Sequence, residues 1–270
     1  MWDKMKKGFL LLLAALLPLM AQGQDLEVYG RASVAADVKL VKGLHLQVEE
    51  ELRCGSGFSS LGSVRTTASL SYKAAKFLKF GAGYTLINPY KASEASFNYP
   101  RHRLWADVTG SLRLGDFQLS LKEKLQFTHR TGVFNVYQST PDAWSLKSRV
   151  GVKYKGFDGV EPSLSFEVRT ALNEPWGTTS GYTQTSASGK IYYNYTPTGY
   201  TNVYNNRYRL NLGADIQLSK HHQLEPYVML DFCSDYEIDT NGDGTRLFSE
   251  TTGWNDSKGL VLGLSYTYSF

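Results

Sequence analysis

The last twelve residues, 259–270, alternate between two kinds of side chain, and this alternation limits the possible folds more than any other feature of the sequence. One set is apolar or aromatic: Leu260, Leu262, Leu264, Tyr266, Tyr268 and Phe270. The other set is mostly small or hydroxylated: Val261, Gly263, Ser265, Thr267 and Ser269. A period of two predicts a β-strand with one greasy and one polar face. A strand of this kind at the C-terminus is not typical of a soluble domain.

The same alternation runs through the chain from residue 26 onward. We expect strands at 26–40, 44–53, 63–73, 77–87, 101–114, 117–128, 144–155, 161–172, 207–218, 224–234 and 259–270. Along each strand, apolar side chains on one face oppose charged or hydroxylated side chains on the other, which suits lipid outside and a polar lumen inside. The sequence therefore predicts an all-β fold, an antiparallel transmembrane up-and-down β-barrel. A soluble β-sandwich, with its apolar faces packed together, is the rival architecture.

Short and long connections alternate along the chain. The short ones are at 42–43, 74–76, 115–116, 156–159 and 219–222, and the long ones are at 54–62, 88–100, 130–143, 173–206 and 236–256. Short periplasmic turns and long external loops are typical of outer-membrane barrels, and aromatic side chains cluster near both ends of the strands. Eleven strands are recognisable, but bacterial single-chain barrels have an even number. We therefore expect ten to twelve strands and favour twelve.

The N-terminus reads as a secretory signal peptide over residues 1–23, leaving 24–270 as a single barrel domain. Lys4, Lys6 and Lys7 precede an apolar run over 9–20, and small residues follow at 21–23. The run is shorter than the roughly 20 residues that a spanning helix needs. The mean hydropathy of −0.31 does not exclude a barrel, because only alternate residues face lipid. The net charge of +4 is small and scattered, so no nucleic-acid partner is expected.

Two resemblances follow from these motifs. The final strand, closing on Phe270, resembles the C-terminal signal that the barrel-insertion machinery reads in bacterial outer-membrane barrels, although Ser265 stands where such signals often carry Gly. The whole mature chain is similar to an uncharacterised family of Gram-negative outer-membrane barrels, a domain of unknown function. That likeness is carried by Arg-Tyr-Arg-Leu at 207–210, Ser-Lys-His-His at 219–222 and Glu-Pro-Ser at 161–163. The resemblance implies the cell outer membrane as location, with outer-membrane lipid and the insertion machinery as partners. It implies no activity.

The predicted interior carries both signs of charge, with a basic surplus. The main lumen-facing candidates are Arg31, Glu49, Glu51, Arg53, Arg65, Arg103, Asp107, Arg149, Glu167, Arg169, Arg207, Arg209 and Asp215. A barrel of this size has a narrow interior. These charges either pair across the lumen and plug it, or leave a small pore with a weak preference for anions.

One stretch, 239–250, fits the calcium-loop pattern D-x-[DN]-x-[DN]-G-x5-E. Asp239, Asn241, Asp243 and Glu250 would supply the oxygen ligands, and Gly244 the sharp turn. The flanking segments read as strands instead of the helices of an EF-hand. Calcium is therefore the one cofactor considered, and an acidic, glycine-rich loop tip is the alternative.

Four residues depart from the simple barrel pattern. Glu50 and Glu123 interrupt the outward apolar face, so we expect a bulge to turn each inward, or a partner protein to cover it. Cys54 and Cys233 lie near the same end of their strands. An exported protein permits a disulfide between them, and two separate thiols are the alternative.

Nothing in the sequence assembles a catalytic constellation, so we expect a protein that is not an enzyme. Its role would be structural or surface-binding through the external loops, with an unknown external ligand or protein; the loop 173–206 is rich in tyrosine. A narrow, weakly anion-preferring diffusion pore is one alternative. The other is a barrel hydrolase acting on lipid or peptide, for which His102 or His129 beside a loop carboxylate is the only remnant.

Overall fold

The computed structural model describes residues 26–132, 135–189, 191–197, 199–242 and 247–270. The strands are β1 (Glu27–Val41), β2 (Leu44–Cys54), β3 (Leu61–Lys73), β4 (Leu78–Lys91), β5 (Ser96–Phe97), β6 (Arg101–Leu114), β7 (Phe117–Arg130), β8 (Asp142–Tyr154), β9 (Val160–Glu174), β10 (Thr178–Thr185), β11 (Ile191–Pro197), β12 (Asn202–Gln217), β13 (His222–Gly242) and β14 (Leu247–Ser269). Two single 3-10 turns accompany them, η1 (Ser56–Phe58) and η2 (Ala92–Glu94). No helix within the described ranges has the length and apolarity to cross a membrane. The expected signal peptide, 1–23, lies outside the described residues.

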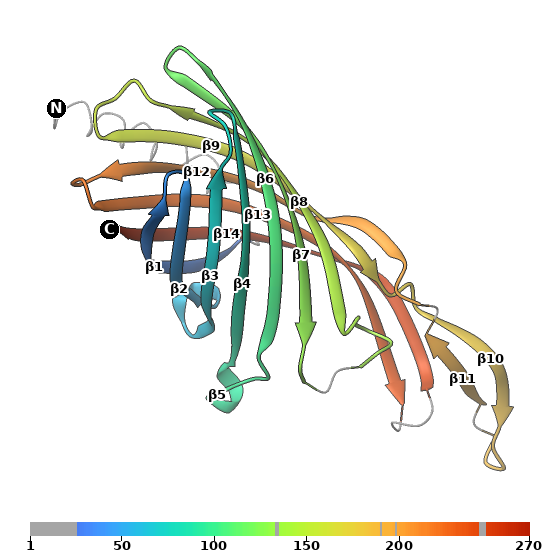
Figure 1. Cartoon of the computed structure of the whole chain (residues 1–270). Coiled ribbons are helices and arrows are strands. Elements are labelled where there is room, and N and C mark those ends of the chain that lie inside the picture. Colours follow the sequence, from blue (N-terminus) through green and yellow to red (C-terminus); the bar gives the residue numbers. More distant parts are fainter. Residues whose placement is uncertain (1–25, 133–134, 190, 198, 243–246) are drawn as a thin grey trace.

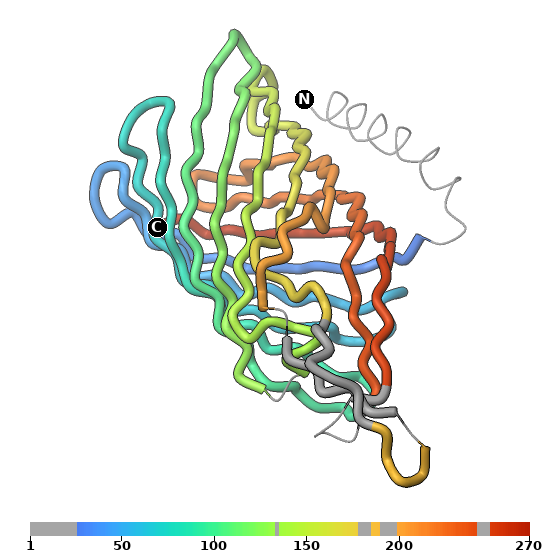
Figure 2. Tube along the Cα trace, turned by 90° about the vertical axis from the view of Figure 1, so that its right-hand side faces the viewer, coloured from blue at the N-terminus to red at the C-terminus, as the bar shows by residue number. Residues whose placement is uncertain are grey.

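Eleven strands close into a ring in the order β1-β2-β3-β4-β6-β7-β8-β9-β12-β13-β14 and back to β1 (Figures 1 and 2). This confirms the all-β barrel predicted from the alternation. The preference for twelve strands was wrong. Neighbours in the ring are antiparallel except β1 and β14, which pair in parallel from Glu27↔Gly259 to Asp37↔Ser269. Because each successive strand reverses direction, an odd ring must contain one parallel pair, and here it falls where the two chain ends meet.

The pairing of β1 with β14, called here the seam, is stabilised by hydrogen bonds on both sides of the last strand. The Phe270 amide donates to the Asp37 carbonyl at 2.9 Å, and the Ser269 amide donates to the His221 carbonyl at 2.8 Å. Gly263 leaves room for the Tyr227 ring, since a Cβ built there would lie 2.0 Å from Cζ of that tyrosine. The C-terminal strand is therefore the element that converts a curled sheet into a closed barrel.

The eleven strands of the ring form the wall of the barrel, and its two faces differ as the alternation predicts. Every strand of the ring exposes at least one large apolar side chain on the outside, for example Val34, Val48, Leu70, Phe80, Leu104, Leu121, Val150, Leu164, Leu210, Phe232 and Leu264. The intervening side chains point inward and are mostly charged or hydroxylated. The interior is therefore polar, and the apolar surface is on the outside of the molecule.

The connections separate into two ends. The turns after β1, β3, β6, β8 and β12 are short and share one end, called here the short-turn end; the connections after β2, β4, β7 and β9 are longer and share the other, the long-loop end. The loop expected at 236–256 was wrong, because β13 continues to Gly242 and β14 begins at Leu247. Figure 1 shows these two strands running past the end of the wall. Beyond the wall no surroundings sort alternate side chains, so the segment lacks the period of two although its backbone ladder continues.

The long connection between β9 and β12 contains a second hairpin, β10 with β11, which projects farthest from the ring (Figure 1). The turn of this hairpin follows Thr185, and β11 runs back along β10 through to Pro197. A single residue pair, Tyr193↔Leu247, joins this hairpin to β14.

Candidate functional site

The interior charges form a ladder along one side of the wall. Arg209 donates from Nη1 to Glu167 and from Nη2 to Asp231, both at 3.1 Å. Glu167 also accepts from Arg149 Nη2 at 2.5 Å and lies 4.0 Å from Lys147 Nζ. The register explains these contacts, because Arg209 stands opposite Glu167 in β9 and opposite Asp231 in β13, and Glu167 stands opposite Arg149 in β8.

Other interior ion pairs also lie along the wall, within a strand or between nearby strands. Glu51 accepts from Arg53 Nε at 2.5 Å and lies 3.8 Å from Arg65 Nε. Asp107, almost fully buried, lies 3.0 Å from Lys122 Nζ and 3.8 Å from Lys124 Nζ. On the short-turn side, Lys153 pairs with Asp215 and with Glu161. The interior residues named from the sequence thus lie on the inner face, and the ion pairs found among them run along the wall, within one strand or between strands one or two places apart.

A polar cavity lies in the interior beside this ladder. It has a volume of about 170 Å³ and is lined by Arg31, Arg149, Ser165, Glu167, Arg209, Asn211, Glu225, Tyr227, Met229 and Ser265. This volume is enough for several water molecules. The Oδ1 atom of Asn211 is buried and has no hydrogen-bond partner among the described residues. The lumen at this level is therefore a small polar chamber.

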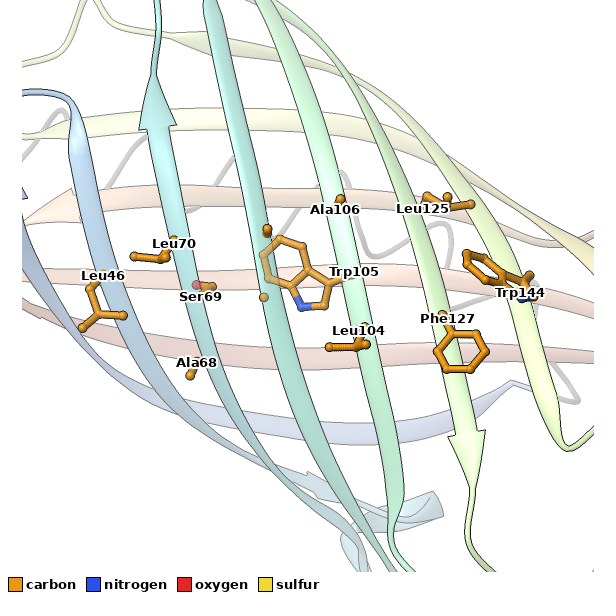
Figure 3. A pocket seen from close by; sticks show the side chains of 12 residues that line it. Leu46, Ala68, Ser69, Leu70, Leu104, Trp105, Ala106, Leu125, Phe127 and Trp144 are labelled. Atoms are coloured by element: carbon orange, nitrogen blue, oxygen red, sulfur yellow. The ribbon is translucent and has the colours of Figure 1, made fainter.

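A larger hollow of about 730 Å³ lies on the outer face, across β2 to β8 (Figure 3). Ala68, Ala82 and Ala106 form its floor, because small side chains stand in adjacent strands between larger ones. Its rim is apolar and comprises Leu46, Leu70, Leu104, Leu125, Phe127 and Trp144. Behind the floor, the Trp105 ring packs against Gly83, and Lys124 Nζ lies 3.6 Å from its centre. Sequence reasoning missed this groove; small residues at matching positions of neighbouring strands were its signal.

Four aromatic rings gather at the long-loop end, where β12, β13 and β14 leave the ring. Tyr236 and Trp254 stand directly opposite each other, with ring centroids 5.4 Å apart. Trp254 also meets Tyr204 edge to face at 5.1 Å, and Trp176 meets Tyr236 at 6.4 Å. Trp254 and Trp176 are 58% and 54% exposed. These four rings, named here the aromatic cluster, present a broad ring surface to solvent.

Tyr200 ties the same end of the molecule together. Its hydroxyl donates to the Val136 carbonyl at 3.0 Å, which joins the β9–β12 connection to the β7–β8 connection. Partial burial raises the pKa of this phenol, so the hydroxyl stays protonated and able to donate.

The residues of the predicted calcium loop are spread over a hairpin. Asp239 and Asn241 lie in β13, Glu250 lies in β14, and Asp243 lies outside the described residues. Glu250 stands opposite Thr240, so the pleat turns it to the other face of the hairpin from Asp239 and Asn241. The described ligands therefore do not converge in this arrangement. Among the described residues, no group of three or more His, Cys, Asp or Glu side chains is placed to hold a metal ion.

The two outward glutamates are not turned inward by bulges. The register runs without a shift through Glu50 in both of its pairings, and likewise through Glu123. Glu123 accepts a hydrogen bond from Ser148 Oγ at 2.6 Å, on the outer face. Both carboxylates therefore interrupt the apolar surface, contrary to the expectation.

The cysteines and histidines have separate local partners. Cys54 and Cys233 are both free thiols, and Cys233 receives a hydrogen bond from Arg207 at 3.1 Å. His102 Nδ1 lies 2.6 Å from the Tyr84 hydroxyl, and His129 Nδ1 lies 2.7 Å from Asp142. Between described residues, no serine hydroxyl hydrogen-bonds to either ring. The hydrolase alternative stays a prediction, which lipid or peptide turnover by a His129→Ala variant would test.

Comparison with known proteins adds a family to this geometry. A family model described as a protein of unknown function, DUF2490, matches residues 32–241. This confirms the resemblance to an uncharacterised family. The matched segment includes the interior ladder and most of the ring. No curated protein matches the chain.

Proposed function

The chain belongs to the DUF2490 family, whose function is unknown, and from this premise we propose that it is an integral β-barrel of the bacterial outer membrane. The signal peptide at 1–23 would export it, and the barrel-insertion machinery would read its last strand. In this setting the short turns face the periplasm, the long loops face outward, and outer-membrane lipid covers the wall.

The observation that carries the proposal is the apolar outer face. Each strand of the ring exposes large apolar side chains there, while most of its charges point inward, Glu50 and Glu123 being exceptions. Soluble monomers rarely expose contiguous apolar patches larger than a few hundred Å². An apolar outer face is compatible with the hydrocarbon core of a bilayer. The closed ring is compatible with it too, because it leaves no unpaired strand edge facing lipid.

The test is the behaviour of the full-length precursor expressed in a Gram-negative host. We expect the mature chain in the outer-membrane fraction, released by detergent but not by urea or carbonate washes. We also expect unboiled protein to migrate differently from boiled protein on a gel, because a closed barrel resists the detergent. A monodisperse protein that stays dissolved without detergent would refute the proposal.

Within the membrane, we assign the protein a non-enzymatic, surface-binding role at the long-loop end. The aromatic cluster supports this role, because exposed tryptophan and tyrosine rings combine a flat apolar face with a polar edge, the surface that sugar rings stack on. Glycans are therefore the ligand class we favour. A glycan array probed with detergent-solubilised protein should give discrete hits that Trp254→Ala loses and Trp144→Ala, an exposed tryptophan of the wall, retains. Equal binding by both variants would contradict the assignment.

The narrow, anion-preferring pore is kept as a second candidate because basic side chains outnumber acidic ones around the interior chamber. The ladder of ion pairs and the small chamber favour a blocked lumen. Recordings in planar bilayers separate the two. The surface-binding proposal expects no discrete conductance steps, whereas reproducible steps with anion preference would favour the pore.

A further inference from the structure

A row of four basic side chains crosses the inner wall at one level. Arg207 in β12 stands opposite Arg169 in β9, Arg169 opposite Lys147 in β8, and Lys147 opposite Lys124 in β7. Like charges that are directly opposed in a sheet destabilise it. Such a row requires negative charge close by.

The acidic residues near the row are outnumbered by the cations there. Asp235 and Glu174 lie close enough to Arg169 to interact with it electrostatically, but neither forms an ion pair with it. Lys124, Lys147 and Arg207 each lie close to a carboxylate. Each of those carboxylates also forms ion pairs with other cations, as Glu167 does with Arg149 and Arg209. Arg169 forms no ion pair with any described residue, and its Nε atom is buried without a hydrogen-bond partner in the part of the chain that is described. The row therefore holds a buried guanidinium Nε donor, that of Arg169, without a partner among the described residues, and the Nε atom of Arg207 is in the same state.

Further cations reach the same place from other strands. Arg103 in β6 lies close enough to Arg169 and Arg209 to interact with them electrostatically. Lys147 likewise interacts with Arg103, Arg169 and Arg209. The Arg103 Nε atom donates to Thr128 Oγ1 at 2.9 Å, which fixes the direction of its guanidinium. Arg103, Lys147, Arg169 and Arg207 form what we name the basic cluster.

We propose that the basic cluster binds a soluble phosphate group, either inorganic phosphate or a small phosphate monoester, inside the barrel. Cations withdrawn from water are costly unless an opposite charge compensates them. Guanidinium groups bind phosphate oxygens through paired hydrogen bonds, and several cations gathered on one face of the wall suit an anion with more than one charge. Because the ring is closed, lipid headgroups have no lateral route to the cluster, and the ligand arrives from solution. The inference depends only on the closed ring, and holds whether or not the protein binds glycans.

The experiment is calorimetric titration of inorganic phosphate into the mature protein in a non-ionic detergent, in a low-salt buffer free of phosphate and phospholipid. We expect saturable binding of about one phosphate per chain, weakened by added chloride through screening. Arg169→Gln should weaken binding by about tenfold or more, because it removes a guanidinium that forms no ion pair with any described residue. Arg113→Gln is the matched control, since Arg113 lies in β6 near the short-turn end and, within the described part of the chain, its hydrogen bond is to the Gly115 carbonyl at 3.1 Å.

The unboiled gel mobility establishes that each variant is folded, and Arg103→Gln replaces Arg169→Gln if the latter does not fold. Phosphate binding that Arg169→Gln or Arg103→Gln loses and Arg113→Gln retains supports the proposal. The proposal fails if the unmodified protein shows no saturable binding, if the cluster variants bind as tightly as the unmodified protein, or if Arg113→Gln loses binding equally.

Discussion

Glu167 is the residue on which the interior ladder most depends. Its carboxylate forms ion pairs with Arg149, Lys147 and Arg209, and its side chain is only 6% exposed. Removing one partner of a buried ion pair leaves the other charge uncompensated and costs about 3–5 kcal/mol. We expect Glu167→Gln to lower the free energy of unfolding by about 3 kcal/mol, measured by denaturant titration in detergent micelles.

The matched control is Glu94→Gln, because Glu94 pairs with Lys91 in a connection where both side chains are more than half exposed. Exposed pairs contribute about 0–1 kcal/mol, so this variant should unfold like the unmodified protein. A Glu167→Gln variant as stable as Glu94→Gln would show that the ladder does not hold the wall together.

At the residue scale, the sequence predicts which side chains face inward but not which of them meet. Alternation assigns Arg209, Glu167 and Asp231 to the same face, because a period of two requires only local information. Their contacts depend on the register between β9, β12 and β13, which turns and closure set together. The surroundings of Arg169 are hidden for the same reason: its charge is visible in the sequence, but its lack of an ion pair with any described residue is not.

At the scale of elements, the parallel seam between β1 and β14 gives a sharp prediction. Ala32 stands opposite Leu264, and both are on the outer face. In a background with Cys54→Ser and Cys233→Ser, Ala32→Cys with Leu264→Cys should form a disulfide, because residues directly opposite in a sheet have suitably close Cβ atoms. Non-reducing gel mobility of the folded protein measures it.

The control pairs Ala32→Cys with Leu260→Cys, four residues away on the same strand and opposite Val28. This pair should remain reduced, because its Cα atoms are too far apart for a bridge. A disulfide in the control but not in the test pair would place the seam in another register, and no disulfide in either would mean that β1 and β14 are not neighbours.

Most strand bounds were predictable to within a few residues, and the errors share physical causes. The count of eleven was read correctly, but the general preference for even numbers argued against it. No local sequence pattern predicts that the first and last strands pair in parallel. The extensions of β13 and β14 were missed because 235–242 and 247–258 lie outside the wall, where no apolar surroundings select alternate residues. The expected bulges at Glu50 and Glu123 were wrong because the register continues unshifted through both residues. A local pattern does not reveal a neighbour on the next strand, such as Ser148, that hydrogen-bonds to the Glu123 carboxylate.

The whole molecule divides into a self-sufficient ring and an appendage, and this division can be tested by deletion. Among the described residues, the β10–β11 hairpin is ladder-paired with the rest of the sheet at one position, Tyr193↔Leu247, whereas the ring closes through other strands. Replacing 178–197 with a short Gly-Ser linker should therefore leave refolding into detergent micelles intact, because shortening a loop changes its closure entropy only slightly.

Deleting 259–270 instead removes the strand that joins β13 to β1, so the sheet stays open with two unpaired edges and should not refold. Refolding without cellular machinery separates this structural role of the last strand from any role as an insertion signal. Equal loss of refolding in both deletions would mean that the hairpin is part of the barrel's stability, and that the ring does not stand alone.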